Sequence, residues 1–412
     1  MNFCVVTFGC RANQADSFRL EEEMCALGHV PVARESADLV VVNTCAVTAA
    51  AERSARQLLA RIAREQPAAR IAVTGCYATR QPDRLERLPR VVALVPNPRK
   101  AGLASAIGPA APAEAGPAVL VPGAGGRTIY PLQVQAGCDE RCSYCVVPFT
   151  RGPSTSRPLE AVVADARRLA AAGYQEAILT GVHLGAWGRD LAPRRSLGEL
   201  LAALDVLPGD LRFRLSSLEP MDCTPEVIRQ VARRGSRLAP HLHLPLQHAS
   251  DAVLKAMRRP YTFDGFRRLL EVVRTAVPDA AIGTDVIAGF PGESEADVKR
   301  LEQALDELPL SYAHVFAYSD RPGTEASRRR PKVSPREIRE RAARLRERAD
   351  GLRRRFEARQ AGTERPALTL GDGTVALTDN YLKVRIPPGL PRNVRVRVRV
   401  VGHTPLGGEV VT

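Results

Sequence analysis

Three closely spaced cysteines form the group of residues best suited to chemistry in this chain. Cys138, Cys142 and Cys145 follow a C-x3-C-x2-C pattern within one short loop. Thiolates are soft ligands that suit zinc or the iron of iron–sulfur clusters. Three thiolates would fill three corners of a cluster and leave one iron open, and an open metal position is where substrate or cofactor chemistry takes place. No Cys or His follows closely after Cys145, so a zinc loop with a distant fourth ligand and three unrelated free cysteines are the alternatives.

A second set of three cysteines follows the pattern of the N-terminal strands. Cys10, Cys45 and Cys76 each come directly after a predicted apolar strand. These strands are expected at residues 3–8, 38–43 and 70–74. Loops at the carboxyl ends of parallel strands meet in one crevice, so we expect the three thiols to converge and to bind a second cluster. The alternative is that each cysteine is a small buried hydrophobe.

The remaining cysteines do not share these positions. Cys4, Cys25 and Cys223 are expected to pack in the interior. The total of nine cysteines is odd, which argues against a simple disulfide framework. The first residues have the pattern of a strand and not of a signal peptide, so we expect a cytoplasmic protein. No run of about eighteen apolar residues occurs, so we expect no membrane partner. In that compartment cysteines are more often ligands than disulfide partners.

The first hundred residues alternate between strands and helices, which predicts a parallel α/β sheet. A turn is expected at residues 9–14, followed by a helix over Asp16–Leu27. An Arg-rich helix is expected over Ala49–Glu65 and ends before Pro67. Val91–Val95 is a candidate fourth strand.

An Ala-, Gly- and Pro-rich stretch at residues 101–127 is expected to be a linker, and a second domain follows it at residues 128–327. The second domain contains six strand–helix units, which is short of the eight units of a complete β/α barrel. Its strands are expected at residues 129–135, 176–180, 211–215, 241–244, 280–288 and 312–316. An open six-unit barrel has a lateral mouth that suits a large substrate.

Polar residues follow the strands of this barrel, where a β/α barrel places its active site. Glu219 is the carboxylate best placed to bind a ribose diol, and a surface carboxylate before Pro220 is the alternative. Gly289, Gly292 and Glu293 are expected to form a turn, with or without a ligand close to its backbone. A structural role is favoured over a ligand role for His183, His243 and His248.

Positive charge is concentrated near the C-terminus of a chain whose net charge is +14. Residues 328–360 carry fourteen basic and five acidic side chains, and residues 362–412 carry seven basic and four acidic ones. Such a basic end is typical of a polyanion-binding protein. The alternative is an Arg-rich composition with a solvated helix face, which applies above all to the basic helix expected at Ser334–Arg359.

An all-β segment is expected after this helix. The stretch Val394–Val400 alternates valine with Arg395, Arg397 and Arg399, which predicts a strand with valines inside a small barrel and a row of arginines outside. Arginine rows neutralise phosphates without reading sequence, and a solvated outer face is the alternative. Tyr381 is the only aromatic residue after residue 361, so contacts to backbone phosphates of a polyanion are favoured over base stacking.

These motifs together resemble the radical S-adenosylmethionine (SAM) methylthiotransferases from end to end. The N-terminal signature is Thr7–Cys10, Asn43–Cys45 and Gly75-Cys76, and the central one is the cysteine loop with Pro148 and Arg151-Gly152-Pro153. Gly289–Glu293 and Tyr318–Thr324 also fit, and the segment Asp379–Val384 resembles the TRAM RNA-binding domain. The resemblance implies an α/β fold with four parts. These are an N-terminal methylthiotransferase domain (1–100), a radical SAM partial barrel (128–327), a basic helix (328–361) and a TRAM-like small β-barrel (362–412). The linker (101–127) joins the first two parts.

Family membership implies SAM and two 4Fe–4S clusters as cofactors. The cluster on Cys138, Cys142 and Cys145 would cleave SAM to a 5′-deoxyadenosyl radical, and the cluster on the other three cysteines would carry or deliver sulfur. The reaction would replace an unactivated C–H bond by C–S–CH3, which calls for cofactor chemistry. Carried over by position, Glu219 would meet the SAM ribose, Gln247 would line the site, and Ile287 and Gly289 would lie near the adenine. Tyr144 also fits the SAM-binding pattern, and the RNA-binding residues would be Lys383, Arg395, Arg397 and Arg399.

The resemblance also suggests a substrate. Thr7–Gln14, Asn43–Thr48 and Thr180–Gly185 look most like the group that acts on threonylcarbamoyladenosine in tRNA. The expected function is therefore a tRNA-processing transferase that inserts sulfur and a methyl group at C2 of N6-threonylcarbamoyladenosine 37. Its partners would be the tRNA anticodon stem-loop and an electron donor such as flavodoxin or ferredoxin, with the sulfur donor not indicated. The alternatives are the same chemistry on isopentenyladenosine 37 or on a ribosomal-protein aspartate, and a non-catalytic iron–sulfur RNA-binding protein.

Overall fold

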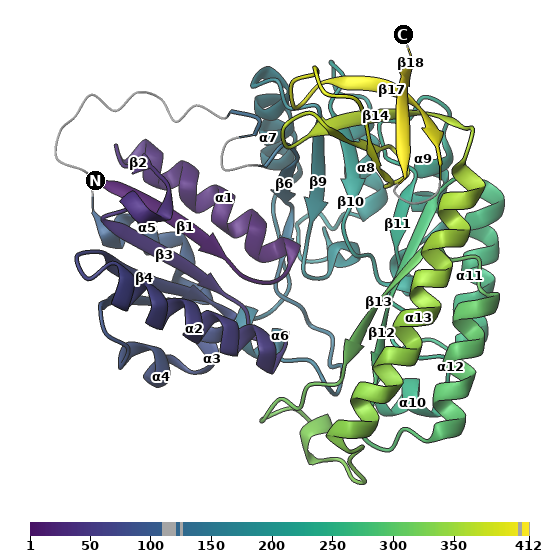
Figure 1. Cartoon of the computed structure of the whole chain (residues 1–412), viewed down its shortest axis with the longest axis horizontal. Helices are drawn as coiled ribbons and strands as arrows, with labels where there is room; N and C mark the ends of the chain where they lie inside the picture. The colour runs from purple at the N-terminus through teal and green to yellow at the C-terminus, as the bar shows by residue number, and fades with distance from the viewer. Residues whose placement is uncertain (109–120, 124–126, 403–405, 412) are drawn as a thin grey trace. The chain divides into compact units, whose positions relative to one another are not determined.

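The computed structural model describes residues 1–108, 121–123, 127–402 and 406–411, and the chain folds into two compact units (Figure 1). The first unit is built from residues 1–120, 136–155 and 319–327, and the second from residues 121–135, 156–318 and 328–412. This division differs from the expected domain boundaries, because the loop with Cys138, Cys142 and Cys145 belongs to the same compact unit as the N-terminal sheet.

The first unit contains a five-stranded parallel sheet with the strand order β2-β1-β3-β4-β5. Its strands are β1 (Asn2–Thr7), β2 (Val30–Pro31), β3 (Leu39–Thr44), β4 (Arg70–Gly75) and β5 (Val91–Pro96). Helices cover both faces of this sheet: α1 (Arg11–Ala26), α2 (Ala49–Glu65), α3 (Cys76–Arg80), α4 (Pro82–Glu86), α5 (Leu103–Ile107) and α6 (Val147–Arg151). The predicted parallel sheet is confirmed, including its fourth strand, and the two-residue β2 is an addition.

Alternate residues of β3 belong to two separate cores, one on each face of the sheet. Leu39 and Val41 pack with Met24 of α1, whereas Val40 and Val42 pack with residues of α2. A strand that is covered on both faces is continuously apolar, which explains why β3 was recognisable from its sequence.

Two parts of the first unit differ from the sequence-based expectation. Helix α1 begins at Arg11 rather than at Asp16, so the turn expected at residues 9–14 is limited to the residues before Arg11. The stretch expected to be a linker opens with helix α5, in which Leu103 is fully buried in the core with α1 and β1.

The second unit contains the predicted open barrel of six parallel strands. The strands form two triplets, β6-β9-β10 and β11-β12-β13, and the parallel bridge Ser217↔His243 links them. Their bounds are β6 Tyr130–Gln133, β9 Glu176–Thr180, β10 Arg212–Leu215, β11 His241–His243, β12 Ala281–Ala288 and β13 Tyr312–Ala317. The helices between them are α7 Leu159–Ala171, α8 Leu197–Asp205, α9 Pro225–Ala232, α10 Asp251–Ala256, α11 Phe263–Ala276 and α12 Glu295–Glu307. The short strands β7 (Gln135–Ala136) and β8 (Thr155–Ser156) flank the cysteine loop.

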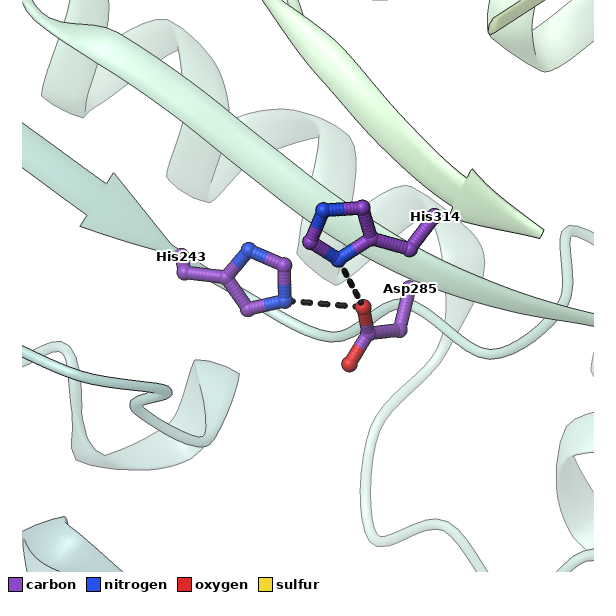
Figure 2. A group of neighbouring side chains, drawn as sticks. All are labelled: His243, Asp285 and His314. Carbon is purple, nitrogen blue, oxygen red and sulfur yellow. Dashed lines mark hydrogen bonds and ion pairs between the residues drawn. The ribbon is translucent and has the colours of Figure 1, made fainter. Parts of the chain in front are cut away.

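The strands β11, β12 and β13 each contribute one polar side chain to a single group (Figure 2). Asp285 of β12 lies in register with His314 of β13, and His243 comes from β11. Figure 2 shows both imidazole rings pointing toward the Asp285 carboxylate.

A long helix and a small β-barrel complete the second unit. Helix α13 (Pro335–Gln360) begins at a capping box of Ser334 and Glu337, and its predicted apolar face is buried. The barrel is closed in the order β14-β15-β16-β18-β17. Its strands are β14 Glu364–Leu370, β15 Val375–Thr378, β16 Lys383–Arg385, β17 Arg395–Val401 and β18 Gly407–Val411. The alternation in β17 is as predicted, with Val398 and Val400 buried and the three arginines exposed.

Among the described residues, no helix combines the length and the apolar character needed to cross a membrane.

Candidate cluster and SAM site

The three N-terminal cysteines converge at the carboxyl edge of the first sheet. Cys10 is the residue before α1, Cys45 follows β3 and Cys76 opens α3. The Cys10 and Cys76 thiols are close enough to Cys45 to raise its pKa by charge repulsion. Gly9 lies so close to Cys45 that a Cβ on it would sit 2.5 Å from the sulfur, and the glycine has a φ of +91°. The predicted convergence of the three thiols is therefore present.

The chemistry of this donor set fits an iron–sulfur cluster. Burial, with smaller contributions from the two neighbouring thiols, raises the pKa of Cys45 to about 12. A thiol with such a pKa is protonated at neutral pH unless a metal ion replaces its proton, because thiolates rather than thiols bind metals. Asn97 also donates a hydrogen bond from Nδ2 to the Cys76 sulfur over 3.3 Å. Hydrogen bonds to the sulfurs are among the features by which proteins adjust cluster potentials.

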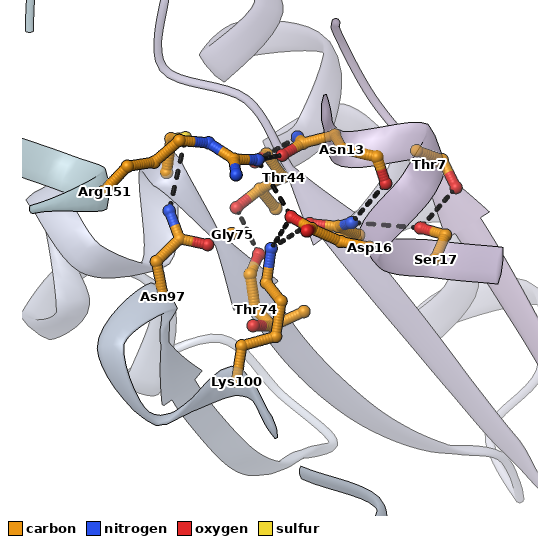
Figure 3. A network of polar contacts seen from close by, with 12 residues as sticks. Thr7, Asn13, Asp16, Ser17, Thr44, Thr74, Gly75, Asn97, Lys100 and Arg151 are labelled. Atoms are coloured by element: carbon orange, nitrogen blue, oxygen red, sulfur yellow. Dashed lines mark hydrogen bonds and ion pairs between the residues drawn. The ribbon is translucent and has the colours of Figure 1, made fainter. Parts of the chain in front are cut away.

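A buried charge network lies beside these thiols (Figure 3). The Asp16 carboxylate accepts hydrogen bonds from Lys100 Nζ at 2.7 Å and from Arg151 Nη2 at 2.9 Å. Burial by itself would raise the pKa of Asp16, but the two cations lower it to about 2. Arg151 also interacts with the charges of Cys76 and Cys10. Two cations held by one carboxylate leave one net positive charge next to the thiols.

Asparagine side chains hold this network against the sheet. Asn13 of α1 donates from Nδ2 to the carbonyl oxygens of Phe8 and Thr44, and its own side-chain oxygen accepts a hydrogen bond from Arg151. Asn43 of β3 accepts from Lys100 at 3.1 Å. Both asparagines are fully buried, so the charges are fixed in position rather than solvated.

The loop with the other cysteine triad belongs to the same compact unit. Cys138, Cys142 and Cys145 are each partly exposed, and Tyr144 is half-buried. The Cys138 N–H donates to the Gly152 carbonyl at 3.1 Å, and the Val147 N–H donates to the Cys145 sulfur at 3.4 Å. These contacts fold the loop back on α6, with the three cysteines partly exposed.

The glycine before this loop is required by its close approach to the backbone just before β8. Gly137 has a φ of +69°, and a Cβ there would lie 1.8 Å from the Pro153 carbonyl oxygen. A positive φ and a backbone contact of this kind both exclude a side chain.

A distant segment completes the first unit. Glu52 of α2 is buried and pairs with Arg80 at 2.7 Å and with Arg321. The Ala326 N–H donates to the carbonyl of Ser143, inside the cysteine loop. Residues 319–327 thus brace both α2 and the cysteine loop.

The SAM-binding residues predicted in the second unit lie at strand ends, as expected for a β/α barrel. The Glu219 carboxylate pairs with Arg259, which is itself buried and donates to Tyr261 Oη at 2.8 Å. Gln247 has a φ of +68°, and its backbone bonds to Asp285 and Ile287 of β12. A non-glycine residue in this strained region is characteristic of a functional site. The roles of these residues toward SAM remain predictions.

The predicted glycine turn is held by its own glutamate. Both oxygens of Glu293 accept the Gly289 N–H, at 3.0 and 2.9 Å, and Arg341 of α13 pairs with the same carboxylate at 2.9 Å. A Cβ at Gly289 would lie 2.4 Å from the Ile338 side chain. The N–H of Gly289 is therefore engaged in the turn, and the neighbouring apolar side chain of Ile287 is buried, at 9% exposure.

The arginine row of β17 is partly engaged in internal contacts. Arg399 pairs with Glu364 at 2.7 Å, and Arg397 lies 3.9 Å from the same carboxylate. Arg395 donates to the Gln175 carbonyl at 2.9 Å. Arg397 has the weaker of the two contacts to Glu364 and is 58% exposed, so it is the arginine best able to meet a phosphate. Lys383 is exposed on β16.

Two of the predicted structural histidines pair with carboxylates that also hold an arginine. His183 Nε2 lies 2.6 Å from Asp222, which also pairs with Arg189, and His248 Nε2 lies 3.4 Å from Glu293. The third, His243, lies 2.9 Å from Asp285.

Sequence reasoning missed the cations beside both sites. Arg151 belongs to the Arg151-Gly152-Pro153 motif, which does not by itself indicate a partner, and the sequence around Lys100 and Arg259 gives no signal of theirs. The available signal was the coincidence of Arg151 with a Gly-Pro turn directly after the cysteine loop, which implies a fixed rather than a mobile arginine.

Comparisons with known proteins agree with this geometry. Residues 2–96 match the uncharacterized protein family UPF0004, and residues 132–305 match the radical SAM superfamily. A threonylcarbamoyladenosine tRNA methylthiotransferase of Thermotoga maritima is 35% identical over 378 residues, covering 88% of this chain and 85% of that protein. The tRNA-2-methylthio-N(6)-dimethylallyladenosine synthase of Chloroflexus aurantiacus is 36% identical over 405 residues, covering 92% and 82%.

Solved structures with a similar fold are more distant in sequence. The radical SAM methyltransferase TsrM of Kitasatospora setae, with cobalamin and a [4Fe-4S] cluster bound, superimposes with a TM-score of 0.55 at 17% identity. The match covers 79% of this chain and 77% of that chain. At this identity the similarity shows the fold.

Proposed function

This chain belongs to the radical SAM methylthiotransferases that act on tRNA, and from that premise we propose that it methylthiolates C2 of N6-threonylcarbamoyladenosine 37. Several curated relatives of this substrate class, from Thermotoga maritima, Aquifex aeolicus and Bacillus subtilis, are 33–35% identical over about nine-tenths of the chain. The structural observation that carries the proposal is the convergence of Cys10, Cys45 and Cys76 beside a buried Arg151 from the second cysteine loop. One compact unit contains both cysteine triads, which we propose as the ligands of the two clusters.

SAM and the two 4Fe–4S clusters supply the one-electron chemistry that opens an unactivated C–H bond, together with the sulfur and methyl groups. The residues of this chain hold and tune those groups. Cys138, Cys142 and Cys145 are proposed as ligands of the SAM-binding cluster, and Lys100 and Arg151, both paired with Asp16, keep one net positive charge beside the other. A reductant of the flavodoxin or ferredoxin class and a tRNA anticodon stem-loop complete the proposal, and the tRNA substrate implies a cytoplasmic reaction.

The alternative substrate is isopentenyladenosine 37, which is favoured by the equally similar Chloroflexus relative. The decisive measurement is mass spectrometry of tRNA nucleosides from a strain that lacks this gene. We expect the methylthio form of threonylcarbamoyladenosine to disappear while its unmethylthiolated precursor accumulates. Complementation with the wild-type gene should restore the product, and complementation with Cys138→Ala should not. Unchanged nucleoside levels would overturn the substrate assignment, and a selective loss of methylthio-isopentenyladenosine would establish the alternative.

A purified-protein assay separates the enzyme from a non-catalytic RNA-binding protein. Reconstituted wild-type protein with SAM and dithionite should release 5′-deoxyadenosine under anaerobic conditions. Cys138→Ala should release none, whereas Cys223→Ala, which changes a buried cysteine outside both triads, should behave like wild type. Failure of the wild-type protein to release 5′-deoxyadenosine would favour the binding role.

A further inference from the structure

Three side chains on neighbouring strands of the barrel form a second group of potential metal ligands. His243 Nε2 lies 2.9 Å from Asp285 Oδ1, and His314 Nδ1 lies 3.1 Å from the same oxygen (Figure 2). The three ligand atoms all lie within 4.8 Å of one another. Two imidazoles and one carboxylate on one face form the three-residue set that binds zinc or iron and leaves further coordination positions open.

The two distances from Asp285 match those between neighbouring ligands of one ion. Nitrogen and oxygen ligands about 2.0–2.1 Å from a zinc ion, at angles of about 90–110°, lie roughly 2.9–3.4 Å apart. The distances of 2.9 and 3.1 Å from Asp285 Oδ1 to the two imidazoles fall within that range. Because each residue comes from a separate β-strand, the ligand positions are fixed by the sheet rather than by a loop.

A further contact orients one of the imidazoles. Tyr312 Oη lies 3.2 Å from His243 Nδ1 and 2.7 Å from His241 Nε2. With Nδ1 of His243 bonded to the phenol, its Nε2 is directed at Asp285. Hydrogen bonds of this kind to the second ring nitrogen are typical of metal-binding histidines.

The charge balance at Asp285 differs from that at the other histidine–carboxylate pairs. Asp222 has Arg189 beside His183, and Glu293 has Arg341 beside His248. Within the described residues, the ion pairs of Asp285 are with the two histidines, and no arginine or lysine is among its partners. A partly buried carboxylate between two imidazoles, with no arginine or lysine paired to it in the described part of the chain, has a place for a cation.

The group is accessible from solvent. The His314 side chain is 57% exposed although it lies in the middle of a parallel strand. His314 and Tyr312 also line a cavity of about 460 Å³, which α13 and the turn with Tyr381 close on the other side. An ion could therefore reach His314 from the cavity, and its remaining positions would be open to a small molecule or to water.

We propose that His243, Asp285 and His314 bind one divalent transition-metal ion of the zinc class, separately from both iron–sulfur clusters. This site goes beyond the proposed tRNA modification and does not depend on the identity of the modified nucleoside.

Zinc titration of the cluster-loaded protein tests the proposal. Isothermal titration calorimetry with Zn²⁺ should show one site in the wild-type holoenzyme that is lost, or at least about tenfold weaker, in His314→Ala and in Asp285→Asn. His314→Ala removes an exposed side chain, so its fold should be retained, and an unchanged iron content with unchanged circular dichroism would verify this. His183→Gln is the matched control, because it removes a histidine from a carboxylate pair that has an arginine, and zinc binding should be unchanged.

X-ray absorption at the zinc edge identifies the ligands. Nitrogen and oxygen neighbours with imidazole scattering are expected for the proposed site, and sulfur at about 2.3 Å would instead indicate cysteines. Tyr312→Phe should weaken zinc binding by about 10- to 100-fold without changing this spectrum. Zinc binding that is the same in wild type, His314→Ala and Asp285→Asn, or a sulfur-ligated spectrum, would overturn the proposal.

Discussion

Replacement of Asp16 by asparagine should strongly destabilise the first unit, because this carboxylate neutralises two buried cations. The side chain is 9% exposed and holds Lys100 and Arg151 at 2.7 and 2.9 Å. Its pKa is lowered from 3.8 to about 2, and about 1.4 kcal/mol per pKa unit gives roughly 2 kcal/mol for the ionised over the neutral form. Removing one member of a buried ion pair typically lowers the free energy of unfolding by about 3–5 kcal/mol. We therefore expect Asp16→Asn to cost about 2–4 kcal/mol.

Amide hydrogen exchange in α1 (Arg11–Ala26) measures this cost locally, which matters because the chain has two units and need not unfold in one step. A loss of about 2–4 kcal/mol corresponds to exchange that is roughly 30- to 1,000-fold faster. Asp38→Asn is the control, since the exposed Asp38 accepts one backbone hydrogen bond, from Asn2, and its loss should cost about 1 kcal/mol or less. Adding Lys100→Met to Asp16→Asn should recover part of the loss, because it removes one uncompensated cation.

The pH dependence of this effect has a definite sign. A carboxyl group with a depressed pKa stabilises the fold above its unfolded pKa of 3.8 and loses that effect only as the pH falls through about 2. The difference between wild type and Asp16→Asn should therefore be the same at pH 6 and at pH 8. Equal exchange in Asp16→Asn and Asp38→Asn, or a difference that disappears at pH 6, would refute the reasoning.

Three further predictions concern the clusters and RNA. Cys10→Ala should lower the iron content from about eight to about four per chain while SAM cleavage continues, and an unchanged iron content would exclude the second cluster site. Gly137→Ala should reduce iron to about four and abolish 5′-deoxyadenosine release, because its Cβ would meet the Pro153 carbonyl; normal SAM cleavage would contradict this. Arg397→Ala should weaken tRNA binding at low salt and reduce the slope of log K against log salt by about one, measured by filter binding, and an unchanged slope would remove Arg397 from the interface.

The elements of the fold were largely predictable because their signals are local. Helix α2 was predicted with its observed bounds, Ala49–Glu65, since Thr48 caps its start and Pro67 lies just beyond its end. The alternation of valine and arginine in β17 indicated that one face of that strand is buried, and the continuous apolar run in β3 indicated that both of its faces are buried. The convergence of the cysteine thiols followed from topology, because parallel strands share one carboxyl edge.

The charge pairs were not predictable, because periodicity reports which face a residue occupies and not its partner. Arg151 meets Asp16 across 135 residues, and Arg321 meets Glu52 across 269 residues. The partners of the arginines on the outer face of β17 were not predictable either. These arginines were expected to be available to phosphates, yet Arg399 pairs with Glu364 and Arg395 with a backbone carbonyl. The partner of Glu219, Arg259, lies 40 residues away and was missed for the same reason.

The distant segment that braces the first unit has a consequence for how this protein is made. The ribosome adds about 5–20 residues per second, so Arg321 emerges roughly 13–54 s after Glu52. During that interval the nascent N-terminal sheet has Arg80 as a partner for Glu52 but has no brace on the cysteine loop, whose Ser143 carbonyl still lacks Ala326. The first unit therefore reaches its final form only after most of the second unit has been synthesised, and a fragment that ends near residue 127 would lack Arg151 as well.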